Sequence, residues 1–156
     1  MKKRVVWLGV ALLSLCGQGV SAQAGLELSQ AWVRAMPPGQ PATAAYLVVR
    51  NAGAEPVVIN AASADRAGRV EIHATQEVDG MLSMRQQASV TVPAGGELGF
   101  APGGLHLMLL DLPSVPREGE QVEVCLHSGD ARFCTIAEVS RQGPGGESAG
   151  RAHEHH

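Results

Sequence analysis

The chain has 156 residues, which is enough for one domain around a single hydrophobic core. Apolar residues make up 45% of the chain and the formal net charge is −3, a composition that excludes both a disordered chain and a membrane bundle. The only lysines are Lys2 and Lys3, so the rest of the chain is more acidic still. Binding to nucleic acid, which needs a basic surface, is therefore not expected.

The N-terminal segment has the three parts of a secretory signal. A basic start through Arg4 precedes an apolar run from Val5 to about Cys16, and the small residues of a cleavage site follow as Val20-Ser21-Ala22 or Ala22-Gln23-Ala24. The run is shorter than the roughly 20 residues of a transmembrane helix, so we expect cleavage after Ala22, export to a Gram-negative type of periplasm and no remaining membrane span. The alternative is a lipoprotein anchored through Cys16, although Leu15 stands where such signals usually carry a small residue.

Ten short segments rich in Val, Leu and Ala, separated by Gly and Pro, are typical of β-strands. They are Leu26–Arg34, Ala44–Asn51, Pro56–Ser63, Arg69–Glu77, Met81–Gln87, Ser89–Pro93, Glu97–Ala101, Leu105–Asp111, Gln121–His127 and Arg132–Val139. No segment has the pattern of an amphipathic helix. The spacing predicts an all-β domain over residues 23–139, folded as an antiparallel Greek-key sandwich or barrel. Residues 140–156 are rich in glycine and are expected to form a flexible tail.

Two cysteines, Cys125 and Cys134, flank a predicted two-residue turn at Gly129 and Asp130. A hairpin with this turn places them directly opposite each other, at a non-hydrogen-bonded pair where side chains come close. In an exported protein this arrangement predicts a disulfide. The alternative is a redox-active or metal-binding pair of thiols, but eight residues separate the two cysteines, unlike a C-x-x-C motif.

Two histidines and two methionines fall on shared strand faces. His106 and Met108 are two residues apart in a predicted strand, and a hairpin turn at Asp79-Gly80 makes His73 the diagonal neighbour of Met84. Thioether and imidazole ligands suit Cu(I), whereas Ca²⁺ and Mg²⁺ prefer oxygen and Zn²⁺ more often takes thiolate or imidazole. Taken singly, each residue also has an ordinary explanation as a core methionine or a surface histidine.

Such a ligand set suits a carrier better than an enzyme. Thioethers bind weakly enough to release Cu(I) to a partner that offers thiolates, and an ion with four protein ligands has no open position for catalysis. Glu71 precedes His73 by two residues and is expected to act as an outer partner of that histidine or as a solvated carboxylate. We expect no catalytic residue.

The four residues have the spacing H-x10-M-x21-H-x-M, and the chain resembles the PCu(A)C family of periplasmic copper chaperones from Leu26 to Val139. The segments that carry the resemblance besides the motif are Ala31-Trp32-Val33-Arg34, Pro37-Pro38-Gly39, Ala44-Ala45-Tyr46, Asn51, Glu71-Ile72-His73, Pro93-Ala94-Gly95 and Pro102-Gly103-Gly104-Leu105-His106-Leu107-Met108. The resemblance implies a cupredoxin-like fold and Cu(I) bound by His73, Met84, His106 and Met108. It also implies copper supply to the Cu(A) centre of cytochrome c oxidase, beside Sco-type proteins.

Three further possibilities stay open at this point. The protein could be a periplasmic copper buffer or resistance protein that does not deliver its copper, or a structural β-sandwich module that binds no metal. The tail residues His153, His155 and His156 could form a second site for Cu(II), as the resemblance to family members with His- or Met-rich tails suggests.

Overall fold

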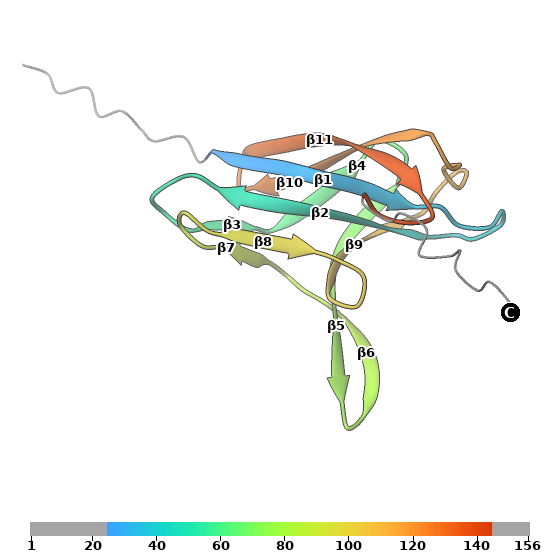
Figure 1. Ribbon diagram of the computed structural model, residues 1–156, viewed down its shortest axis with the longest axis horizontal. Helices are drawn as coiled ribbons and strands as arrows, with labels where there is room; N and C mark the ends of the chain where they lie inside the picture. The colour runs from blue at the N-terminus through green and yellow to red at the C-terminus, as the bar shows by residue number, and fades with distance from the viewer. Residues whose placement is uncertain (1–24, 145–156) are drawn as a thin grey trace, which may run out of the picture.

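The computed structural model describes residues 25–144, and eleven strands form in this part of the chain (Figure 1). They are β1 (Leu26–Arg34), β2 (Thr43–Asn51), β3 (Val57–Ile59), β4 (Ala61–Ala64), β5 (Arg69–Val78), β6 (Met81–Gln86), β7 (Val90–Val92), β8 (Glu97–Phe100), β9 (Leu105–Leu110), β10 (Gln121–Ser128) and β11 (Ala131–Ser140). Within residues 25–144, no helix is long and apolar enough to cross a membrane. The predicted signal segment and the tail histidines lie outside the described residues.

One sheet dominates the molecule. Nine strands belong to it, in the order β1-β11-β10-β4-β5-β9-β2-β8, with β6 paired to β5. A further pairing of β1 with β2 closes this sheet on itself as a barrel, whereas β3 and β7 form a separate two-stranded sheet (Figure 1). The prediction of an all-β, mostly antiparallel fold is confirmed.

The pairing of β1 with β11 differs from the expected antiparallel pattern. These strands are parallel, with Trp32 opposite Glu138 and Arg34 opposite Ser140. Hairpin patterns in a sequence reveal only neighbours joined by short turns, and this contact joins the two ends of the domain. The sequence therefore contains no local sign of it.

The predicted single strand Pro56–Ser63 is wrong as one element. The chain breaks at Asn60, whose backbone N–H donates to the carbonyl of His127 at 3.0 Å. The residues before the break pair with β7 and those after it pair with β10, so the chain passes from one sheet to the other. Apolar residues continue on both sides of Asn60, which is why the hydrophobic pattern does not show the break.

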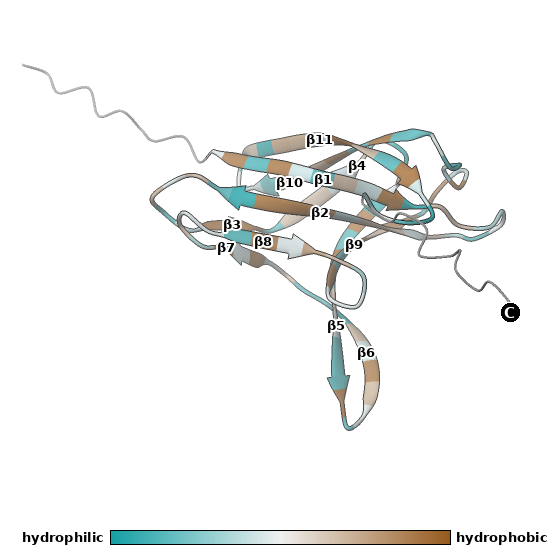
Figure 2. Ribbon diagram, viewed as in Figure 1, coloured by the Kyte–Doolittle hydropathy of each residue, from teal (hydrophilic) through white to brown (hydrophobic). Residues whose placement is uncertain are grey.

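Every second residue along the strands points into the barrel, and apolar side chains at these positions fill its interior. On β10, the side chains of Val122, Val124 and Leu126 are buried, and on β9 those of Leu107 and Leu109 are buried too. Burying each such aliphatic side chain stabilises the fold by about 1.5–3 kcal/mol. Figure 2 shows the resulting mixture of hydrophobic and hydrophilic bands along the strands. Residues of the opposite parity, which include those of the predicted metal set, face outwards.

The hairpin of β5 and β6 projects from the barrel (Figure 1). Its turn is Asp79 and Gly80, as predicted, and both have positive φ, as a type I′ turn requires. Thr75 therefore lies opposite Met84. The apolar side chains on β6 are exposed, with Leu82 at 77% and Met84 at 59%. In Figure 2 the ribbon of β6 carries brown, hydrophobic bands.

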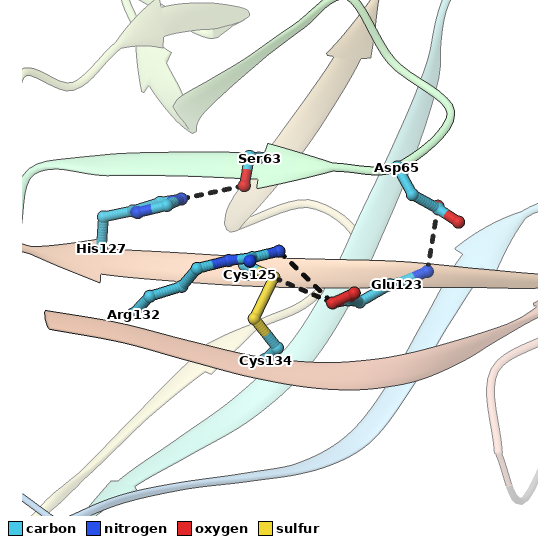
Figure 3. Close-up of a disulfide and its surroundings, with 7 residues drawn as sticks. All are labelled: Ser63, Asp65, Glu123, Cys125, His127, Arg132 and Cys134. Atoms are coloured by element: carbon cyan, nitrogen blue, oxygen red, sulfur yellow. Dashed lines mark hydrogen bonds and ion pairs between the residues drawn. A yellow bond between two sulfur atoms is a disulfide. The ribbon is translucent and has the colours of Figure 1, made fainter.

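The predicted disulfide joins Cys125 on β10 to Cys134 on β11, directly opposite each other with Cα atoms 4.1 Å apart. Figure 3 shows its surroundings, where the Oε2 atom of Glu123 lies 3.6 Å from Cys125 Sγ and 3.3 Å from the guanidinium of Arg132. Glu123 and the two cysteines have the spacing of a small metal cluster. Both sulfurs are consumed by the bridge, however, so this cluster has no thiolate to offer.

Candidate metal centre

Two of the predicted ligands face each other on neighbouring strands. The antiparallel register of β5 and β9 places His73 opposite His106, and their ring centroids are 5.8 Å apart. The side chain of His73 is 19% exposed, and His106 is almost fully buried. The sheet itself thus brings together two imidazoles that are 33 residues apart in the sequence.

The His106 ring is oriented by the bend that precedes β9. Its Nδ1 atom lies 3.0 Å from the carbonyl oxygen of Gly104, two residues earlier. Because a carbonyl oxygen can only accept, Nδ1 carries the proton and donates it, which leaves a lone pair on Nε2. A backbone acceptor on one ring nitrogen is the usual way in which a metal-binding histidine is held.

The His73 ring is oriented by a carboxylate. Its Nε2 atom lies 2.8 Å from Glu71 Oε2, and Glu71 is also paired with the guanidinium of Arg69. Nδ1 of His73 is buried and has no hydrogen-bond partner among the residues that the structure describes. A buried polar atom without a partner costs about 1–3 kcal/mol, so this nitrogen fits a position where a ligand would bind.

The two methionines lie at a cavity beside the histidines. Its volume is about 380 Å³, and its lining includes Met84, His106 and Met108. Met84 comes from β6, and His106 and Met108 come from β9. Thr75 on β5 also lines the cavity. Three of the four predicted residues thus share one cavity. His73 is not in its lining and reaches the group through its contact with His106.

Two residues of this cavity were given no role in the sequence interpretation. Arg34, at the end of β1, and Met36, in the loop that follows, both line it. The Arg34 guanidinium lies 5.6 Å from the centroid of the Tyr46 ring, and its Nε atom is buried with no hydrogen-bond partner within residues 25–144. Hydrophobic periodicity does not reveal this placement, because closure of the barrel brings the end of β1 and the following loop to the cavity.

The donor set defines what the group can do chemically. It offers two imidazole nitrogens with free lone pairs and two neutral thioether sulfurs, while Glu71 is already engaged by His73 and Arg69. Soft, mostly neutral donors favour a soft monovalent ion. The fold and this group together define a β-barrel domain with a histidine–methionine centre on its outer face.

Solved structures share this architecture. The "Copper-bound PCuAC domain from PmoF2" superposes with a TM-score of 0.62 at 20% identity, covering 77% of this chain and 97% of that chain. The "Solution structure of CuI-DR1885 from Deinococcus Radiodurans" matches with a TM-score of 0.60 at 30% identity, covering 80% of this chain and 85% of that chain. The predicted resemblance to PCu(A)C domains and their cupredoxin-like fold is confirmed.

A family match covers most of the chain. Residues 26–139 match the family described as "Putative lipoprotein LpqE-like", and the chain belongs to this family. It is also 32% identical over 145 residues to "Putative lipoprotein Lxx21020" of Leifsonia xyli subsp. xyli, which covers 86% of each chain.

Proposed function

We propose that the protein binds one Cu(I) ion through His73, Met84, His106 and Met108. The observation that carries this proposal is the pair of facing imidazoles, each with one nitrogen held and the other free, beside a cavity lined by both methionines. Two similar solved structures are named as copper-bound, one of them with Cu(I), which supports the choice of metal.

The ligand set allows the ion to be released as well as bound. Thioethers are neutral and weak donors, so a partner that offers thiolates can replace them one at a time. Met84 lies on the projecting hairpin and is the most exposed of the four ligands, so we expect it to be exchanged first. The role is that of a carrier and not of an enzyme, because four protein ligands leave no open position for a substrate.

The acceptor we propose is the Cu(A) centre of cytochrome c oxidase, with Sco-type proteins acting in the same assembly. The competing function is a copper buffer that holds the ion without passing it on. The two differ in what happens when the protein, loaded with one equivalent of Cu(I), is mixed with a purified Cu(A) domain and separated from it again. Copper in the Cu(A) fraction supports delivery, copper kept by the carrier supports the buffer, and a protein that takes up no Cu(I) at all is a structural module.

We propose that the chain is exported and anchored through a lipid on Cys16, in place of release after Ala22. The family and its Leifsonia relative are both described as lipoproteins, and Cys125 and Cys134 are bonded to each other. Cys16 is then the one remaining cysteine of the chain's three. Residues 23–139 would be the copper-binding domain and residues 140–156 its tail.

Metabolic labelling with palmitate tests the anchor. The wild-type protein should carry label and separate into the detergent phase, and Cys16→Ala should lose both properties. A mature wild-type protein that begins at Gln23 and carries no lipid would show that release after Ala22 is correct.

We also propose that the tail histidines His153, His155 and His156 bind Cu(II) separately from the folded centre. Deleting residues 150–156 should abolish Cu(II) binding at pH 7 and leave Cu(I) binding intact. An imidazole in water has a pKa of about 6.5, so Cu(II) binding by the full chain should fall steeply between roughly pH 7 and 5. If the shortened protein binds Cu(II) with unchanged affinity, the proposal of a tail site is refuted.

A further inference from the structure

We propose that Met36 is a fifth residue of the copper centre, a third thioether that contacts the bound Cu(I) beside Met84 and Met108. This inference rests on the proposed Cu(I) function. Its basis is one cavity of about 380 Å³ whose lining contains three methionines, Met36, Met84 and Met108, together with His106. The H-x10-M-x21-H-x-M spacing does not include Met36, which lies 37 residues before His73.

The local chain holds Met36 at this cavity. Ala35, directly before it, donates its backbone N–H to the carbonyl of Ser140 at 2.9 Å, so the chain is still fastened to β11 at this point. Pro37, directly after it, restricts Met36 to extended backbone conformations. The side chain is half-buried, yet it is not a member of the hydrophobic core cluster. A role as core filler therefore does not account for its position.

The arrangement of the cavity gives the three sulfurs a role that differs from that of His73. The three methionines line the cavity, whereas His73 is not in its lining and contacts the lining residue His106. An ion that comes through the cavity meets thioethers first and the second imidazole last. Thioethers do not titrate and bind Cu(I) in preference to hard cations, so they suit the entry step.

A charge at the same cavity adds selectivity for the oxidation state. Arg34 lines it next to Met36, and its guanidinium is permanently positive. Coulomb repulsion scales with the charge of the ion, so Arg34 opposes Cu(II) twice as strongly as Cu(I) at the same distance. The cavity thus combines soft neutral donors with one positive charge, and this combination favours Cu(I) over Cu(II).

The direct test follows the methionine methyl groups by NMR. The full chain labelled with ¹³C at the methionine methyls is titrated with Cu(I) under anaerobic conditions, up to one equivalent. We expect the resonances of Met36, Met84 and Met108 to shift together. Met81 is the internal control, because it is 71% exposed on β6 and does not line the cavity.

A matched pair of variants tests the same point by affinity. Met36→Leu and Met81→Leu each replace a thioether by an apolar group of similar volume, a change that cores tolerate well. We expect Met36→Leu to lower Cu(I) affinity against a competing chelator by about tenfold, the size typical of supporting residues at metal sites, and Met81→Leu to leave it unchanged. The methyl spectrum of the wild type decides the question even if Met36→Leu does not fold.

The outcomes separate this inference from the function on which it rests. If no methionine methyl shifts and no Cu(I) is taken up, the proposed function is wrong. If Met84 and Met108 shift while Met36 does not, or if Met36→Leu behaves like Met81→Leu, the copper function stands and the role of Met36 is refuted.

Discussion

His73 and His106 face each other across β5 and β9, and each imidazole is held by an acceptor two residues earlier in the chain. For His106 the acceptor is the backbone carbonyl of Gly104, and for His73 it is the carboxylate of Glu71. Only the second acceptor is a side chain. The two halves of the pair can therefore be perturbed separately by mutation.

Glu71→Gln should loosen His73 and leave His106 untouched. The variant removes the charge that holds Nε2 and also the pairing with Arg69, so Cu(I) affinity should fall about 10–100-fold, as for other partners of metal-binding histidines. Competition with a Cu(I) chelator measures this. Glu97→Gln, at an exposed position on β8, is the control, and equal affinities for the two variants would contradict the proposed orientation of His73.

Replacing both Met84 and Met108 by leucine should abolish tight Cu(I) binding without unfolding the protein. Met84 is 59% exposed and Met108 is half-buried, so neither contributes much to the core, and Met→Leu conserves volume. X-ray absorption on the copper-loaded wild type should show sulfur and nitrogen neighbours. Scattering from nitrogen or oxygen alone would exclude the thioethers as ligands.

Removing the disulfide should destabilise the domain without changing its fold. The bridge closes a loop between residues nine apart, and replacing both Cys125 and Cys134 by alanine should lower the free energy of unfolding by about 2–3 kcal/mol. The eight residue pairs of the β10–β11 hairpin remain to hold the sheet together. Urea denaturation of the two forms gives the difference, and equal midpoints would mean that the bridge does not constrain the unfolded chain.

The stability of the domain should depend on pH through Glu120. The backbone N–H of Arg117 and the guanidinium of Arg66 lower the pKa of this carboxyl group in the folded state. Its contribution is therefore complete above the pKa of the unfolded chain, about 4.3, and is lost as the pH falls through the folded value. Glu120→Gln should melt at a lower temperature than the wild type at pH 7, and the gap should close towards pH 3. A gap that stays constant from pH 7 to pH 3 would contradict this contribution of Glu120.

The sequence predicted most of the fold because the strands are short and joined by recognisable turns. The turns at Gly129-Asp130 and Asp79-Gly80 determine the registers of two hairpins, and from these follow the facing of Cys125 with Cys134 and the position of Met84. Such contacts are local in the chain, so turn chemistry is sufficient to predict them.

The features that the sequence did not predict depend on contacts between distant segments of the chain. The break at Asn60 follows from the choice between two sheets, and the placement of Arg34 and Met36 at the cavity follows from closure of the barrel. Neither has a signature in hydrophobic periodicity. The facing of His73 with His106 was reachable only through the family resemblance, because no turn connects β5 directly to β9.

The parallel pairing of β1 with β11 gives the domain a polarity. Strand β1 begins with Leu26 at one pole of the domain and ends with Arg34 at the other, where Ser140 lies beside it. Nine extended residues separate the two poles by roughly 30 Å. The cavity lined by Met84, His106 and Met108 is at the Arg34 pole, where β11 also ends. A protein held to a bilayer through Cys16 would therefore be fastened from the Leu26 pole. The cavity would then lie at the end of β1 opposite to the end at which the chain enters the domain.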